Sequence, residues 1–303
     1  MSIIIDAEKQ VLVQGITGRE GRARTQLMKE YGTKIVAGVT PGKGGQEVDG
    51  IPVYDTVVEA WENHGSIDIS VLFIPAPLVK DAAMEAFDAG VRQLVIVPDR
   101  VPIYDVLEIS AAAKRCNGNF IGPNTLGVLS PGKGVLGMIG GRASSARSWF
   151  IPGPLGITSR SGGITSSMAY YLAKEGLGAT TLVHVGGDVV VGLPHPEVVK
   201  LFQDDPETKA IVMFGEIGGT QEEDVAALVE AGTITKPIIA FIGGKAAKSG
   251  TRFSHAGAII EGNRGTYEGK VSRLREVDVM VVDAFGDLPK ATSEVLEKHG
   301  IQV

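Results

Sequence analysis

The chain has 303 residues and a formal charge of −6, from 29 basic and 35 acidic side chains. This balance weighs against nucleic acid as a partner, because neutralising phosphates needs clustered lysine and arginine. The single cysteine, Cys116, excludes an internal disulfide and a cysteine-based zinc site, and no metal site is expected. No apolar run approaches the ~20 residues of a membrane helix, and the first ten residues lack the apolar core of a signal peptide. We expect a cytoplasmic protein without a membrane partner.

Apolar strands alternate with amphipathic helices along the first half of the chain. Strands are predicted at 10–14, 34–39, 69–74, 93–97 and 119–121, and helices at 22–31, 57–63, 80–89 and 104–115. The second half repeats this order, with strands at 155–158, 180–185, 210–215, 238–241 and 279–282 and helices at 164–174, 196–203, 221–231, 266–275 and 290–299. Continuous apolar strands separated by helices are typical of parallel sheets covered on both faces.

Between the halves lies a small, polar segment rich in proline and glycine. It has neither helical nor strand periodicity, so a domain boundary is expected there. The fold class is therefore α/β, with two doubly wound parallel-sheet domains at 1–141 and 154–303 and a linker at 142–153.

Glycine is unusually frequent: it makes up 41 of the 303 residues, whereas an average usage of roughly 7% would give about half as many. The glycines follow apolar, β-branched segments, where they allow tight turns or the close approach of a ligand to the backbone. Gly15 to Gly21 has the spacing GxxGxxG after the first strand. NAD, NADP, coenzyme A and a simple turn all fit this looser relative of the dinucleotide fingerprint.

The end of the second strand favours one of these ligands. An NAD-binding chain is expected to carry an acidic residue there to bind the ribose. This chain instead places Lys43 in a glycine-rich loop, which suits a further phosphate and indicates a multiply phosphorylated ligand such as coenzyme A. Pro75, in IPAP, offers rigid apolar backbone for an adenine, and Val97, Pro98 and Asp99 end the fourth strand. These prolines could also do no more than end strands.

Ser159-Arg160-Ser161-Gly162-Gly163 joins a strand to a helix in the second half. It is neither a Walker A loop nor a GxSxG elbow, but a helix start made of small residues can bind an anion.

Four of the five histidines have structural interpretations: His64 and His299 as helix caps, His184 as a core residue and His195 as part of a turn. His255 differs, because Ala256, Gly257 and Ala258 leave room for a phosphoryl group or substrate. Glu216, at a strand end, could hold the proton of one ring nitrogen and leave the other as a nucleophile. Alternatively, His255 is a structural histidine and Glu216 is a charged turn residue.

Taken together, these segments resemble a known family along nearly the whole chain. QGITGREG, GVTPGKGG, IPAP, IGPNTLGVLSPGK, SRSGG, GEIGG and HAGAII occur in the order found in the α subunit of succinyl-CoA synthetase. The same module occurs in malate–CoA ligases, citryl-CoA synthetases and ATP-citrate lyase. The resemblance implies a Rossmann-like CoA-binding domain followed by a flavodoxin-like ligase domain.

The resemblance also implies roles for individual residues. The residues that would bind CoA are Thr17, Gly18, Arg19, Glu20, Lys43, Pro75, Val97, Pro98, Asp99 and Asn124. His255 would be phosphorylated transiently, with Glu216 as its orienting partner. The phosphate and substrate would rest on Ser159, Ser161, Gly162, Gly163 and Ser166.

The implied reaction joins a small carboxylic acid to CoA through a phosphohistidine and an acyl phosphate. A separate β subunit would carry an ATP-grasp site for ATP or GTP with Mg²⁺, in an αβ or α₂β₂ assembly. No triphosphate-binding loop occurs in this chain, which agrees with that division of labour.

Departures from the family pattern leave the acid open. The succinate enzymes read SRSGTLTYE where this chain reads SRSGGITSS, so their tyrosine is Ser166 here. Citrate, malate and a sulfonated acid are therefore alternatives to succinate. Two other classes of function are alternatives: a CoA-binding regulatory module without turnover, and an NAD-dependent oxidoreductase. The intact His255 and Glu216 speak against the first, and Lys43 speaks against the second.

Overall fold

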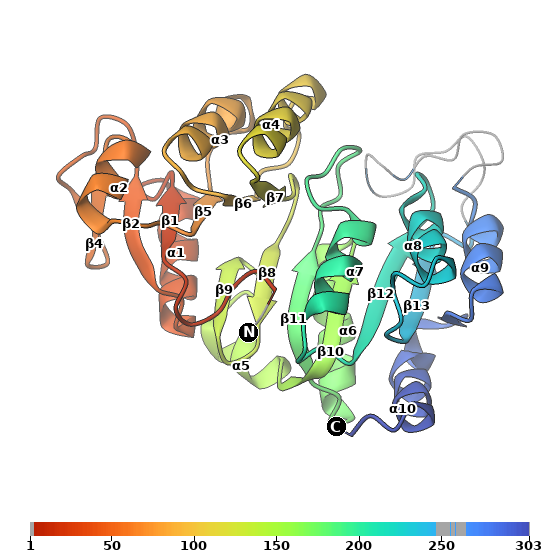
Figure 1. The fold of residues 1–303 in the computed structure, drawn as a ribbon. Coiled ribbons are helices and arrows are strands. Elements are labelled where there is room, and N and C mark those ends of the chain that lie inside the picture. Colours follow the sequence, from red (N-terminus) through yellow and green to blue (C-terminus); the bar gives the residue numbers. More distant parts are fainter. Residues whose placement is uncertain (1–2, 247–254, 256–257, 259–264, 303) are drawn as a thin grey trace.

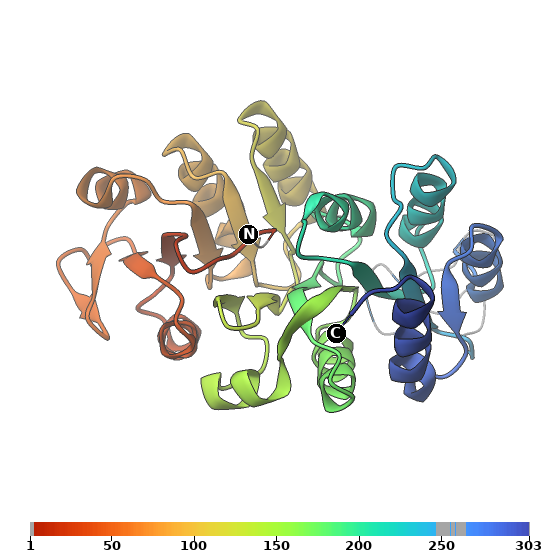
Figure 2. The same ribbon diagram turned by 60° about the horizontal axis from the view of Figure 1, so that its bottom comes forward.

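Two seven-stranded sheets lie side by side in a computed structural model that describes residues 3–246, 255, 258 and 265–302 (Figure 1). The strands are short, apolar and mostly buried, as the continuous apolar runs predict. Helices cover both faces of the sheets. In the turned view, α2, α3, α4, α7, α8 and α9 lie on one side and α1, α5, α6 and α10 on the other (Figure 2). The structure therefore has the two-sheet α/β architecture expected from the sequence.

The first sheet has the order β3-β4-β2-β1-β5-β6-β7 and is parallel except for the edge strand β3. Its strands are β1 (Val11–Gln14), β2 (Ile35–Val39), β3 (Glu47–Val48), β4 (Ile51–Tyr54), β5 (Ile69–Leu72), β6 (Gln93–Ile96) and β7 (Asn119–Ile121). Its helices are α1 (Arg19–Tyr31), α2 (Val57–His64), η1 (Ala76–Leu78), α3 (Val79–Asp88) and α4 (Ile103–Arg115).

The second sheet has the order β14-β13-β12-β10-β11-β8-β9. Its strands are β8 (Gly127–Ser130), β9 (Gly134–Gly137), β10 (Pro152–Ser159), β11 (Ala179–His184), β12 (Ala210–Glu216), β13 (Ile238–Gly243) and β14 (Met280–Val282). Its helices are α5 (Ala143–Trp149), α6 (Gly162–Lys174), α7 (His195–Asp204), α8 (Gln221–Glu230), α9 (Tyr267–Glu276), η2 (Phe285–Asp287) and α10 (Leu288–Lys298).

Each sheet has one place where successive connections run in opposite directions. In the first sheet, the chain leaves β1 for β2 on one side and later returns to β5 on the other. In the second, β10 is followed by β11 on one side and by β12 on the other. The helices beside such a pair of strands diverge, so a crevice opens at the carboxyl ends of the strands. Gln14 and Gly15 lie at the first of these ends, and Ser159 and Glu216 lie at the second.

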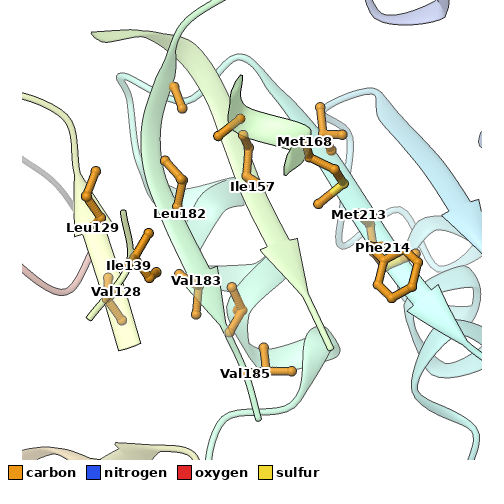
Figure 3. Close-up of a cluster of buried hydrophobic side chains, with 14 of the residues drawn as sticks. Val128, Leu129, Ile139, Ile157, Met168, Leu182, Val183, Val185, Met213 and Phe214 are labelled. Carbon is orange, nitrogen blue, oxygen red and sulfur yellow. The ribbon is translucent and has the colours of Figure 1, made fainter. Parts of the chain in front are cut away.

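The chain passes from the first sheet to the second before the expected linker at 142–153. β8 and β9 form a hairpin that pairs antiparallel to β11, so residues before 142 belong to the second sheet. Val128 and Leu129 of β8 pack next to Leu182 and Val183 of β11 in the apolar core (Figure 3). The segment 142–153 contains α5 and the beginning of β10 instead of an extended linker. The division into domains at 142–153 stays a proposal.

Candidate active site

The His255 imidazole is held by a carboxylate at the end of β12. Its Nδ1 atom lies 3.0 Å from Oε1 and 2.9 Å from Oε2 of Glu216. The Glu216 side chain is 5% exposed and that of His255 is 22% exposed. The structure thus brings together the two residues that the sequence singled out as catalytic. Ala256 and Gly257, which flank the histidine, lie outside the described residues.

A buried arginine stabilises the same carboxylate. Arg160 follows β10 directly, and its Nε atom lies 3.3 Å from Oε1 of Glu216. Its Nη2 atom donates to the backbone oxygen of Asp188 at 3.3 Å. A buried carboxylate needs such a partner, because burial without one is costly. Arg160, Glu216 and His255 therefore form one chain of charged and polar contacts. The sequence showed Arg160 within SRSGG but gave no sign of this partner.

His184, at the end of β11, links the backbone of Leu126 to that of Arg160. Its Nδ1 atom accepts from the Leu126 N–H at 2.8 Å, and Nε2 lies 3.0 Å from the Arg160 carbonyl. The ring is therefore a neutral imidazole that donates from Nε2. Burial, which outweighs the hydrogen bond to Arg160, lowers the pKa of His184 to about 3. The prediction of a core histidine is confirmed.

His195 does not lie in a turn, and that prediction was wrong. It is the first residue of α7 and is completely buried. Its Nδ1 atom lies 2.9 Å from the Thr158 hydroxyl and its Nε2 atom lies 3.1 Å from the Phe214 carbonyl. Burial lowers the pKa of His195 to about 4. The flanking prolines suggested a turn because Pro194 and Pro196 stand at the helix start, where proline is also favoured.

A second buried ion pair supports the backbone of Glu216. The Glu216 N–H donates to Oε1 of Glu222 at 3.1 Å, and the other oxygen of Glu222 binds the fully buried Lys270. Lys270 also binds Glu223 at 2.9 Å. Burial alone would raise the pKa of Glu222, but Lys270 and then His195 outweigh it and hold that pKa below its usual range.

The start of α6 is closely packed on one side and open on the other. Ser159 Oγ bonds within the turn, at 2.9 Å from the Ser161 carbonyl and 3.0 Å from the Ser161 N–H. A Cβ atom on Gly162 would collide with Leu126 and lie 3.1 Å from Nδ1 of His184, whereas one on Gly163 would meet nothing within 4 Å. Ser166 lies one turn further along, with its hydroxyl 3.5 Å from the Gly162 carbonyl. The open side leaves backbone N–H groups for an anion.

A cavity of about 440 Å³ lies at the carboxyl ends of β1, β2 and β5 in the first sheet. Thr17, Gly18 and Pro75 line it, together with Gln14 and Thr40, which are not among the predicted binding residues. Gly15 has φ +80°, and a side chain there would collide with the backbone at Phe73. Arg19, Glu20 and Lys43 are exposed and are not among its lining residues. The first two begin α1, and Lys43 lies in the turn after β2, where its N–H donates to Asp55 at 2.9 Å. The shape suits a large ligand that approaches the backbone closely.

The other predicted CoA residues lie where the two sheets meet. The Asn124 N–H donates to the Pro98 carbonyl at 2.7 Å, which ties the segment before β8 to the end of β6. Asp99 and Asn124 line a cavity of about 390 Å³ together with His255. Val97 packs against the larger apolar core. The structure therefore places the predicted residues in two groups rather than in one pocket.

Within the described residues, no group of three or more His, Cys, Asp or Glu side chains is arranged to hold a metal ion. None of the helices in the described ranges has the length and apolar character needed to cross a membrane.

Comparison with known proteins agrees with this geometry. Residues 6–99 match the family model of the CoA binding domain, and residues 158–280 match that of CoA-ligase. Over 98% of its length the chain is 44% identical to succinate–CoA ligase [ADP-forming] subunit alpha 1 of Archaeoglobus fulgidus, of which 99% is covered. The chain belongs to the family of ADP-forming acid–CoA ligase α subunits. It is an enzyme subunit that binds CoA.

Other members of the acid–CoA ligase family are almost as similar. The sulfoacetate–CoA ligase subunit SauD of Bilophila wadsworthia is 42% identical, with 97% of each chain covered. Among solved structures, ATP citrate lyase of Methanothrix soehngenii in complex with citrate and coenzyme A aligns with a TM-score of 0.92 at 23% identity. The alignment covers 99% of this chain and 52% of that one, and it shows a shared fold.

Proposed function

We propose that this ligase subunit activates a short acid by passing a phosphoryl group through Nε2 of His255. The chain of contacts from Arg160 through Glu216 to Nδ1 of His255 is the observation that carries the proposal. Because Nδ1 is engaged by the carboxylate, the nitrogen that attacks phosphorus is Nε2. The negative charge of Glu216 stabilises the positive charge that develops on the ring during this attack.

The acid then attacks the phosphohistidine and becomes an acyl phosphate, which is a better acyl donor than a carboxylate. The CoA thiol attacks this acyl phosphate and releases inorganic phosphate. Splitting the reaction in this way allows a phosphoryl group to move between two distant sites. The N–H groups on the open side of α6 would stabilise its charge.

The nucleotide is proposed to bind on a β subunit with an ATP-grasp domain, which would also hold Mg²⁺. Both relatives are named as subunits of ADP-forming ligases, which supports ATP as the phosphoryl donor. An αβ or α₂β₂ assembly is proposed. A cytoplasmic location stays a prediction.

The proposed substrate is a short acid that carries a second anionic group. Two relatives of similar identity are named for succinate and for sulfoacetate, both of which have this form. Malate and citrate also carry a second carboxylate, and a panel of acids assayed for CoA-thioester formation would separate them from succinate and sulfoacetate.

Labelling with γ-³²P ATP tests the proposal directly. The complex with the β subunit is expected to take up an acid-labile, base-stable label, and His255→Asn is expected to abolish it while leaving CoA binding intact. His299→Asn is the matched control, because this histidine follows α10 and is exposed. A His255→Asn complex that still takes label would overturn the assignment.

A further inference from the structure

The cavity beside His255 contains a carboxylate that the reaction described so far does not use. Asp188, in the loop after β11, lines this cavity of about 390 Å³ together with Asp99, Arg100 and Asn124. Asn124 fixes its position: the Asn124 carbonyl accepts from the N–H of Gly187 at 3.1 Å, and Nδ2 donates to Oδ1 of Asp188 at 3.0 Å. The half-buried carboxylate is therefore held in one orientation.

The loop that carries Asp188 runs against the histidine ring. A Cβ atom on Gly187 would lie 2.8 Å from Cδ2 of His255, the ring carbon bonded to Nε2. Asp188 is thus next in sequence to the residue that packs on the proposed phosphorylation edge. Asp99 and Arg100, which follow β6, line the same cavity, and the match to the CoA binding domain ends at Asp99. A thiol that reaches from that domain to an acyl phosphate near His255 must enter this space.

Of the carboxylates around His255, Asp188 is the one best able to accept a proton. Both oxygens of Glu216 bind the histidine, and one of them also binds Arg160. Asp99 is 61% exposed and pairs with the Arg100 guanidinium at 3.4 Å. Within the described part of the chain, Asp188 has a single side-chain hydrogen bond, from Asn124, which leaves its second oxygen available.

The electrostatic surroundings of Asp188 agree with a basic carboxylate. Burial raises the pKa of Asp188, and the negative charge of Asp99 adds to this effect. The Asn124 hydrogen bond and the charge of Arg160 oppose it without cancelling it. A carboxylate whose pKa lies closer to the working pH is a more effective base.

We propose that Asp188 is the general base that accepts the proton of the CoA thiol. This inference rests on the proposed function. As the sulfur attacks the acyl carbon, the S–H proton moves to the second oxygen of Asp188 and the S–C bond forms. The bond between the acyl carbon and the bridging oxygen of the acyl phosphate then breaks, and inorganic phosphate leaves with that electron pair. Asp188 finally returns its proton to solvent.

Asp188→Asn in the complex with the β subunit separates this role from the earlier steps. The variant keeps the size of the side chain and an oxygen that can accept from Asn124. Three rates are measured: labelling of His255 from ATP, formation of acyl hydroxamate with hydroxylamine in place of CoA, and formation of acyl-CoA. We expect the first two at wild-type rates, because neither requires deprotonation of a thiol, and the third slower by roughly 10²–10⁴-fold at pH 7.

The pH profile supplies a readout that a structural defect would not give. The loss of acyl-CoA formation should shrink as the pH approaches the pKa of a thiol, about 8.5, because the thiolate then needs no base. Asp283→Asn is the matched control, because the Asp283 side chain is 64% exposed and pairs with Arg275, and it is expected to keep the wild-type rate of acyl-CoA formation.

Four outcomes would overturn the assignment of the base: acyl-CoA formed at the wild-type rate by Asp188→Asn, an equal loss in all three assays, a loss that does not change with pH, or an equal loss in Asp283→Asn. A wild-type complex that takes no label from ATP would instead overturn the proposed function, and this inference with it.

Discussion

At the scale of single residues, Glu216 contacts two groups of different function. One side of its carboxylate binds Arg160, which is itself 7% exposed, and both oxygens bind the His255 ring. Replacing the carboxylate by an amide removes the charge that both partners face. The amide oxygen can still accept from Nδ1, so the ring keeps one source of orientation.

Glu216→Gln is therefore expected to slow phosphorylation of His255 by roughly 10²–10⁴-fold, the usual range for a lost acid–base or orienting group. Binding of CoA should barely change, because the cavity lined by Thr17 and Pro75 lies on the other sheet. The initial rate of label uptake from γ-³²P ATP measures the first effect, and calorimetric titration with CoA measures the second.

Glu197→Gln is the control for this variant, since Glu197 is about half exposed on α7 and pairs with Lys200. Labelling of Glu216→Gln at the wild-type rate would show that the carboxylate does not assist the histidine.

The sequence predicted the pair of Glu216 and His255 because a carboxylate at a strand end and a histidine among small residues are local patterns. It did not predict the partnership of Arg160, which depends on β10 and β12 being neighbours in the sheet. The role of His195 was missed for the same reason, because this helix residue finds its partners Thr158 and Phe214 on the strands β10 and β12.

At the scale of elements, the start of α6 provides a matched pair of substitutions. Gly162→Ala is expected to destabilise the protein by about 1–3 kcal/mol, because its Cβ would press on Leu126 and His184 in a packed interior. Gly163→Ala adds the same methyl group on the open side and should leave stability unchanged or raise it by about 0.4–1 kcal/mol. Urea unfolding of both variants measures the difference, and equal stabilities would contradict the packing described here.

The ion pair between Glu222 of α8 and Lys270 of α9 is expected to contribute strongly to stability. Lys270→Met should cost about 3–5 kcal/mol, because it leaves the Glu222 carboxylate buried without its partner. Part of the loss should return in the double variant Lys270→Met, Glu222→Gln.

Lys200→Met is the control, because the Lys200 side chain is 41% exposed and its removal should change the free energy of unfolding by no more than about 0.5 kcal/mol. Urea unfolding at pH 7 compares the three variants. A cost no larger for Lys270→Met than for Lys200→Met would show that the buried pair adds nothing.

Elements with strong periodicity were predicted to within a few residues. The strands missed, β3, β4, β8 and β9, have two to four residues each, and β8 and β9 both begin with glycine. Such segments carry too few residues for a periodic pattern. β8 becomes a strand because it pairs with β11, more than fifty residues later in the chain.

At the scale of the whole molecule, the two buried histidines make stability depend on pH. Their folded pKa values are about 3 for His184 and about 4 for His195, against an ordinary value of 6.5. Below pH 6.5 the unfolded chain binds protons that the folded chain excludes, so stability falls as the pH falls towards 4. At pH 5 each histidine should cost ~2 kcal/mol relative to pH 7.

Urea unfolding at pH 7, 6 and 5 measures this dependence. The paired carboxylate of Glu207, whose pKa the Lys133 ammonium lowers to about 2, loses its contribution only below about pH 4.5 and does not mask the effect. A free energy of unfolding that is flat from pH 7 to pH 5 would contradict the neutral, buried state of these two rings.

The hairpin of β8 and β9 makes the two halves of the chain hard to separate. It pairs with β11, yet it also contacts the first half: the Gly137 N–H donates to the sulfur of Met28 at 3.3 Å, and Thr33 bonds Val135 in both directions. A fragment that stops at residue 141 would carry the hairpin without β11. Its exposed strand edge would offer free N–H and C=O groups to other molecules. Such a fragment is expected to aggregate, so gene fusions and truncations in this family should keep the hairpin with the strands that follow it.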